Sequence, residues 1–162
     1  MRRNRTAAIL KAALLVGTLD GLAGMLLYYR ATARSPLGVF PYIASGVFGR
    51  DAFAGGASMV VAGVGFHYFI AFAFTLFFFW LYPRWSGLRR NKIVVGVLYG
   101  VFVWAVMNGL VLPFSNVQRG PFDLTNAVIN AVVLMLTIGL PLAFLADRFY
   151  VRRLPRARSY RL

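Results

Sequence analysis

The sequence contains no cysteine and no glutamate, and acidic residues of any kind are few. The four acidic residues are all aspartate, against eighteen lysines and arginines, so the net charge is +14. The absence of cysteine excludes disulfides, thiolate metal sites and cysteine nucleophiles. Only 14% of the residues are charged and 60% are hydrophobic, whereas soluble domains carry about 25% charged residues. This composition predicts a membrane protein.

Histidine is almost absent as well, because His67 is the only one. One histidine and scattered aspartates cannot form a metal cluster, and no serine has a nucleophile–base–orienter set around it. His67 and a methionine could in principle hold a haem, but methionines in apolar segments usually serve packing. We therefore predict a non-enzymatic protein without a metal or another cofactor.

Four segments are apolar enough, and long enough, to cross a bilayer, which takes roughly 20 residues. They cover approximately residues 7–29, 58–82, 92–112 and 124–147. The predicted fold is all-α, with residues 1–162 forming a single membrane domain. This domain is a polytopic four-transmembrane-helix bundle. Asp123 stands just before the fourth span and is predicted to cap that helix.

The basic residues divide unequally between the two ends of the predicted spans. Fourteen of the eighteen lie in residues 2–11 at the start of the first span, in residues 84–92 where the third span begins, or after the fourth span, where residues 148–162 form a basic tail. The other four are Arg30, Arg34, Arg50 and Arg119. Positive residues favour the cytoplasmic side, so we predict that both termini are cytoplasmic. Since topology accounts for the positive charge, we do not predict nucleic-acid binding.

The N-terminal segment also has features of a secretory signal peptide. Basic residues precede an apolar run, and "ATA" at residues 31–33 is typical of a cleavage site. The apolar run is longer than a usual signal peptide's, however, and Arg30 stands immediately before the possible cleavage site. We therefore favour a retained membrane span.

The loop of residues 30–57 is long and contains about a dozen apolar residues in succession, too few to cross a bilayer. We expect it to contain a short interfacial or re-entrant helix. Ser35 is predicted to cap this helix with Pro36 at its first position, and Pro41 to bend it or to start a second one. A cover over the end of the bundle is favoured over a pore loop.

Each predicted span contributes one polar side chain at a similar depth. Asp20, His67, Asn108 and Asn130 lie about 20 to 25 Å from the basic ends of their spans, at about 1.5 Å per helical residue. Small residues accompany them on the same helix faces and allow helices to approach closely. The glycines predicted to serve helix packing are Gly17, Gly21, Gly24, Gly63, Gly96 and Gly100.

This polar layer has two interpretations. It can be a network of interhelical hydrogen bonds, in which case the protein is an accessory or self-associating membrane protein. Such a protein would contact the lipid bilayer and form a homo-oligomer or join a larger membrane complex. Alternatively, Asp20 and His67 exchange protons in a small proton-coupled transporter or ion channel, since ionisable groups inside a membrane often mark such sites. We favour the first interpretation.

Two further patterns give expectations about side-chain placement. The aromatic run "FHYFIAFAFTLFFFW" at residues 66–80 is expected to face lipid rather than line a ligand site. At the end of the fourth span, Asp147 and Arg148 could form an ion pair at the membrane interface.

Parts of the second and third spans resemble the YagU-like group of small bacterial inner-membrane proteins. The stretches are "FHYFIAFAFTLFFFWLYP" at 66–83 and "GVLYGVFVWAVMNGLVLP" at 96–113. They share an early histidine, a terminal "YP", a glycine pair before a tryptophan and a closing proline. The resemblance implies a four-helix protein located in the bacterial inner membrane. It implies no enzymatic activity.

Overall fold

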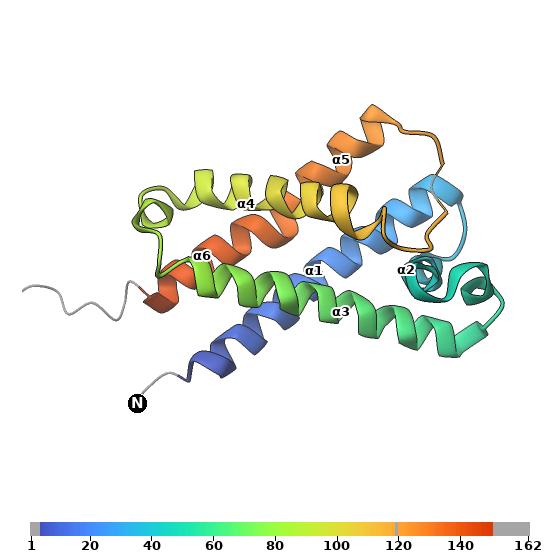
Figure 1. The fold of residues 1–162 in the computed structure, drawn as a ribbon, viewed down its shortest axis with the longest axis horizontal. Helices are drawn as coiled ribbons and strands as arrows, with labels where there is room; N and C mark the ends of the chain where they lie inside the picture. Colours follow the sequence, from blue (N-terminus) through green and yellow to red (C-terminus); the bar gives the residue numbers. More distant parts are fainter. Residues whose placement is uncertain (1–3, 119, 151–162) are drawn as a thin grey trace, which may run out of the picture.

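The computed structural model of the protein describes residues 4–118 and 120–150, and these form an all-α structure (Figure 1). Four long apolar helices and a shorter helix between the first two confirm the predicted fold class. The elements are α1 Arg5–Thr32, η1 Pro36–Gly38, α2 Val39–Phe48, η2 Gly49–Phe53, α3 Gly56–Leu81, η3 Ser86–Arg89, α4 Lys92–Val106, η4 Met107–Val111, α5 Leu124–Leu134, η5 Met135–Gly139 and α6 Leu140–Tyr150. Arg2, Arg3, Arg119 and residues 151–162 of the predicted basic tail lie outside the described residues.

Two of the spans contain a π-helical turn. The third span runs through α4 and η4, and the fourth runs through α5, η5 and α6 without a break. In η5 the N–H of Leu140 donates to the carbonyl of Met135, five residues earlier. Such turns are rare and interrupt the regular pattern of backbone hydrogen bonds.

Residues with short polar side chains cap the N-termini of three helices. Asn4 caps α1 and Asn91 caps α4, each accepting hydrogen bonds from backbone N–H groups of the first turn. Asp123 accepts from the N–H groups of Thr125 and Asn126 at the start of α5, which confirms the predicted cap. These bonds satisfy N–H groups that have no partner within the helix.

The predicted start of the short helix is confirmed in position but not in its capping bond. Ser35 is the N-cap residue and Pro36 the first residue of the 3₁₀ turn η1, which leads directly into α2, but the Ser35 side chain makes no capping hydrogen bond to the described residues. Pro41 does not start another helix. It lies in the first turn of α2, where the missing N–H of proline is tolerated.

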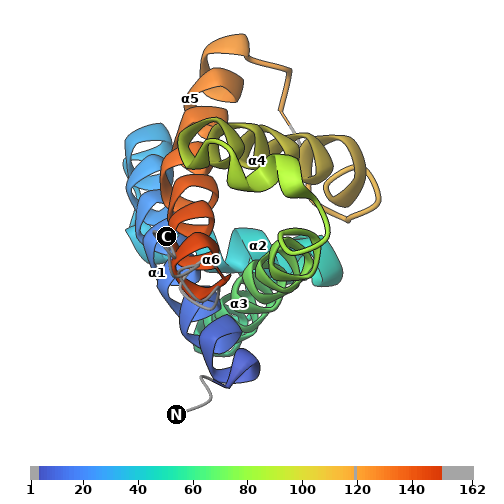
Figure 2. The ribbon, with the colours of Figure 1, turned by 90° about the vertical axis from the view of Figure 1, so that its left-hand side faces the viewer.

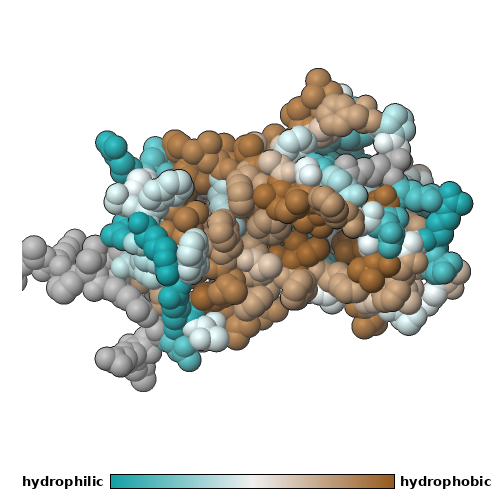
Figure 3. Space-filling view, viewed as in Figure 1, coloured by the Kyte–Doolittle hydropathy of each residue, from teal (hydrophilic) through white to brown (hydrophobic). Residues whose placement is uncertain are grey.

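The surface is divided as expected for a membrane protein. An apolar band covers the middle of the molecule, and hydrophilic residues gather at its two ends (Figure 3). We call the end where α1 begins and α6 finishes the basic end, and the opposite end the α2 end. The four helices are long and apolar enough to cross a bilayer, and lipid would cover this band.

The spans form two closely packed pairs joined through the fourth span. α1 lies against α3, and α4 lies against η5 and α6. α1 also contacts η5 and α6, and α6 reaches α3. Seen from the basic end, α6 therefore lies among the other three spans (Figure 2). The start of α5 projects from the bundle in both ribbon views.

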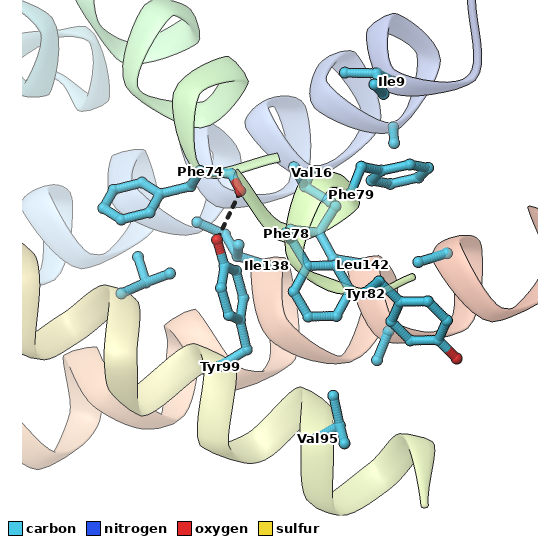
Figure 4. Packing of buried hydrophobic residues seen from close by; sticks show 14 of the residues in the cluster. Ile9, Val16, Phe74, Phe78, Phe79, Tyr82, Val95, Tyr99, Ile138 and Leu142 are labelled. Carbon is cyan, nitrogen blue, oxygen red and sulfur yellow. Dashed lines mark hydrogen bonds between the residues drawn. The ribbon is translucent and has the colours of Figure 1, made fainter. Parts of the chain in front are cut away.

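Consecutive spans α3 and α4 have little backbone contact, and aromatic side chains fill the space between them. The Phe78 and Tyr99 ring centroids are 4.5 Å apart, and those of Phe77 and Phe102 are 5.7 Å apart. The Tyr99 hydroxyl donates to the Phe74 carbonyl at 2.6 Å (Figure 4). Aromatic pairs contribute about 0.5–1.5 kcal/mol beyond area burial. These ring contacts therefore stabilise the packing of α3 on α4 although the two backbones are far apart.

The expectation that the aromatic run of residues 66–80 faces lipid is therefore wrong for part of the run. Phe69, Phe77 and Trp80 are exposed, but Phe74, Phe78 and Phe79 are buried in the core. The reason is that α3 contacts both α1 and the α4–α6 pair, so only a part of its circumference faces lipid.

Asp147 joins three helix ends at the basic end. Its carboxylate lies 3.0 Å from the Lys92 ammonium at the start of α4 and accepts a 3.0 Å hydrogen bond from Tyr82 at the end of α3. The predicted pair with Arg148 is thus replaced, within the described residues, by a pair across helices. Burial and the neighbouring Asp147 raise the pKa of the Tyr82 hydroxyl, which keeps it protonated as a donor.

The Phe79 carbonyl provides a second junction at this end. The Tyr150 hydroxyl of α6 donates to it at 2.7 Å, and the Arg5 guanidinium of α1 donates to it at 3.2 Å. The rings of Tyr82 and Tyr150 also stack, with centroids 5.8 Å apart. All four spans are thus linked at the basic end by these polar contacts and the Asp147 contacts.

The approach of α2 to α3 depends on Gly63, and this gives a test of the structure. A Cβ at Gly63 would collide with the Phe40 backbone carbonyl in α2, whereas a Cβ at Gly65 would meet nothing within 4 Å. We predict that Gly63→Ala lowers the free energy of unfolding by about 1–3 kcal/mol, the usual effect of overpacking.

The matched control is Gly65→Ala, which should leave stability unchanged or raise it by up to about 1 kcal/mol through helix propensity. Thermal unfolding of the detergent-solubilised variants provides the measurement. Equal stability of the two variants would contradict this contact between α2 and α3.

Candidate functional site

Asp20 is held by a side chain from the fourth span. The Thr137 hydroxyl lies 2.9 Å from Asp20 Oδ1 and donates to it. Thr137 lies in η5, thirteen residues from each end of the span Leu124–Tyr150. The hydrogen bond therefore lies at the centre of the apolar region, where a polar group without a partner is costly.

His67 reaches the same turn of α1 from α3. Its Nε2 atom lies 2.7 Å from the Gly17 carbonyl oxygen. A carbonyl can only accept, so Nε2 must carry the proton. The remaining ring nitrogen, Nδ1, is then the acceptor of the neutral ring.

Two glycines on α1 make room for this contact. A Cβ at Gly21 would lie 3.2 Å from His67 Nε2, and one at Gly17 would lie 2.9 Å from the Tyr68 ring. The Tyr68 hydroxyl in turn lies 2.8 Å from the Thr18 hydroxyl. Larger residues at the two glycine positions would push α3 away from α1 and break these contacts.

Asp20 and His67 therefore lie together. Gly17 and Gly21, on either side of His67 Nε2, are within one turn of Asp20 on α1. No hydrogen bond joins the two side chains directly within the part of the chain that the structure describes. We call these residues the Asp20–His67 pair.

Thr137 can satisfy Asp20 in either protonation state. Its hydroxyl lies 2.9 Å from Asp20 Oδ1 and also 2.9 Å from the Val133 carbonyl oxygen in its own helix. A hydroxyl has a single proton. When Asp20 is ionised, the hydroxyl donates to the carboxylate. When Asp20 is protonated, the hydroxyl can donate to Val133 and accept from Asp20, so proton binding leaves no polar group unpaired.

Within the described residues, neither asparagine of the predicted layer bonds to Asp20 or His67. Asn108 donates from Nδ2 to the Trp104 carbonyl at 3.0 Å, within its own span. Asn130 donates from Nδ2 to the Asn126 carbonyl at 2.8 Å, and its side chain is exposed. The structure thus brings Asp20 and His67 together and places Asn130 nearer the α2 end.

The remaining packing glycines lie at different contacts. A Cβ at Gly96 would lie 2.8 Å from Leu140 Cα, and one at Gly100 would meet the Met135 backbone, so both positions admit the fourth span close to α4. Gly24 has only an ordinary contact, since a Cβ there would lie 3.8 Å from Val39.

An open cleft lies between the second half of α1, α2 and the start of α5. Its volume is about 370 Å³. Gly24 lies at its inner limit, one helical turn from Asp20 on the same face of α1. Its lining residues are Gly24, Leu27, Tyr28, Arg30, Ala31, Val39, Tyr42, Asn126, Ile129 and Asn130. We call it the α1–α5 cleft.

Sequence reasoning did not identify Thr137 as the partner of Asp20, nor the Thr18–Tyr68 contact. The sequence feature that pointed toward Thr137 is its spacing, because it follows Asn130 by seven residues and a regular helix places both on one face of the fourth span. Which face meets α1 depends on helix rotation, which the apolar pattern does not fix. No group of residues that could hold a metal ion occurs in the described ranges.

Comparison with known proteins identifies no relative. No family model matches the chain, and neither a curated protein nor a solved structure matches it.

The hydrogen bond between Thr137 and Asp20 can be tested by removing the hydroxyl. We predict that Thr137→Val lowers the free energy of unfolding by about 0.5–2 kcal/mol, in the range of interhelical hydrogen bonds in membranes. It should also shift the infrared band of the Asp20 carboxyl group, because that group loses a hydrogen-bond partner.

Thr137→Ser is the matched control, because it keeps the hydroxyl and should preserve both properties. If valine and serine gave the same stability and the same carboxyl band, Thr137 would not be bonded to Asp20.

Proposed function

We propose that the protein is a multi-pass membrane protein that binds and releases protons at the Asp20–His67 pair, as a small proton-coupled transporter does. The observation that carries this proposal is a carboxyl group and an imidazole placed together at the centre of the apolar spans. Ionisable side chains at such a depth are expensive to bury and frequently mark proton pathways.

The charge states of the pair explain how it would bind and release a proton. In a medium of low dielectric constant, a pair without net charge is favoured. The pair has no net charge either as carboxylate and imidazolium or as carboxylic acid and neutral imidazole. Adding a proton leaves a positive charge, and removing one leaves a negative charge. A change in access to water or in the position of a helix would shift this balance and so drive proton uptake or release.

Two features of the surroundings support the proposal. Thr137 can pair with both forms of Asp20, so a proton can be exchanged without leaving a buried group unpaired. The α1–α5 cleft approaches to within one turn of Asp20, about 6 Å along α1, so little protein separates Asp20 from the polar groups of the cleft on the α2 side.

The second candidate is an accessory or self-associating membrane protein. It is favoured by the observation that the bonds of Asp20, His67 and Tyr68 all connect α1 to another span, as purely structural bonds would.

A cytoplasmic location of the termini, a bacterial inner membrane and membership of the YagU-like group remain predictions.

Proton binding can be measured directly. We predict that infrared difference spectra of the reconstituted protein, recorded between acidic and alkaline buffer, contain a carboxyl band that Asp20→Asn abolishes. In proteoliposomes with a pH gradient, wild-type protein should carry protons, and Asp20→Asn should reduce the flux to that of empty liposomes. The reason is that an amide cannot exchange a proton.

Asp51→Asn is the control, since Asp51 is an exposed carboxylate in η2, and its flux should equal that of the wild type. A carboxyl band that does not respond to pH, together with equal background flux in all three proteins, would favour the accessory role.

A further inference from the structure

We propose that the α1–α5 cleft binds a phospholipid with an anionic headgroup, taken from the leaflet at the α2 end. The cleft lies between two membrane-spanning helices, at a depth where a lipid's headgroup meets its acyl chains. Arg30 stands two residues before the last residue of α1, and Gly24 six residues deeper. The cleft thus extends about 9 Å along α1 from the interface toward the apolar region.

The polar groups of the cleft match a phosphate diester and its ester linkages. Arg30 is exposed and forms no hydrogen bond or ion pair with any described residue, although its side chain lines the cleft. Arginine binds phosphate through two parallel hydrogen bonds. Asn126, near the start of α5, and Asn130, one turn deeper, also line the cleft. Each amide nitrogen already makes one hydrogen bond, Asn126 Nδ2 to Asp123 Oδ2 and Asn130 Nδ2 to the Asn126 carbonyl. An amide nitrogen carries two protons, so each has a second N–H that can donate to the ester oxygens below a lipid's phosphate.

The apolar groups of the cleft favour a lipid over a soluble anion. Leu27 of α1, Val39 of α2 and Ile129 of α5 line it beside the polar residues. A soluble phosphate would leave these side chains in contact with water, whereas the first part of an acyl chain would cover them. The volume of about 370 Å³ is in the range of small-molecule sites.

The position of α5 gives a lateral entrance. The start of α5 projects from the bundle (Figures 1 and 2) and makes little contact with α1. A cleft that opens sideways to lipid and has an arginine at the level of the headgroups can hold the phosphate of a lipid. This inference does not depend on proton exchange at the Asp20–His67 pair, because none of the residues that it uses bonds to that pair.

Native mass spectrometry of the purified full chain tests the proposal. The protein is titrated in mild detergent with phosphatidylglycerol or with neutral phosphatidylcholine. We expect phosphatidylglycerol to occupy one site more tightly. Arg30→Gln should weaken that first binding event about tenfold, which corresponds to about 1.4 kcal/mol and is typical of a charged hydrogen bond.

Arg34→Gln is the matched control, because Arg34 is an exposed arginine at the same end and does not line the cleft. It should bind phosphatidylglycerol as the wild type does. Gly24→Leu, which places a side chain at the inner end of the cleft, should also weaken binding, provided that its thermal unfolding is unchanged.

Three results would overturn the proposal. The first is equal affinity of the wild type for the two lipids, and the second is an equal loss in Arg30→Gln and Arg34→Gln, which would indicate general surface attraction. The third is displacement of phosphatidylglycerol by an equal concentration of glycerol 1-phosphate, which would make the cleft a site for a soluble anion.

Discussion

The close contact of α1 with α3 at Gly17 and Gly21 is the constraint on which the rest of the structure depends. The two glycines let an imidazole and a phenol lie directly against the α1 backbone. Because α3 is held close to α1 on one side, a wider space separates its other side from α4. Aromatic rings of both helices fill this space. One helix thus uses small residues for a close neighbour and large residues for a distant one, and the fourth span is fitted between them.

Hydropathy and local polar residues were sufficient to predict the four spans and the short helix, but not which face of each helix meets its neighbours. The four spans, the short helix in the first long loop and the Asp123 cap follow from run length and local polar chemistry. The aromatic run of α3 was placed wrongly because a lipid tail and a protein core are equally apolar, so composition cannot distinguish a phenylalanine in lipid from Phe78 in the core. The partner of Asp147 was missed because Lys92 lies far away in sequence.

The candidate site was predictable to the extent that depth and residue type define it. Asp20 and His67 could be predicted to meet because charged groups inside a membrane need partners. Thr137 could not be selected from sequence, because its role depends on the rotation of the fourth span, and this span contains a π-helical turn where Thr137 lies. An extra residue in one turn changes which side chains follow on the same face. Depth alone placed Asn130 in one layer with Asp20 and His67. In the structure, Asn130 instead lines the wall of the cleft.

The polar contacts at the basic end give the bundle a mechanical asymmetry. Lys92, Tyr82, Tyr150 and Arg5 connect all four spans there through Asp147 and the Phe79 carbonyl. At the opposite end, α5 begins apart from α1 and an open cleft separates them. The other elements at that end are held, because α2 packs on α3 and Asn116 donates to the Gly46 and Val47 carbonyls of α2. The first turns of α5 are therefore the part of the bundle with the fewest neighbours, and a rigid-body movement of this helix would widen or narrow the cleft while the contacts at the basic end keep the four spans together.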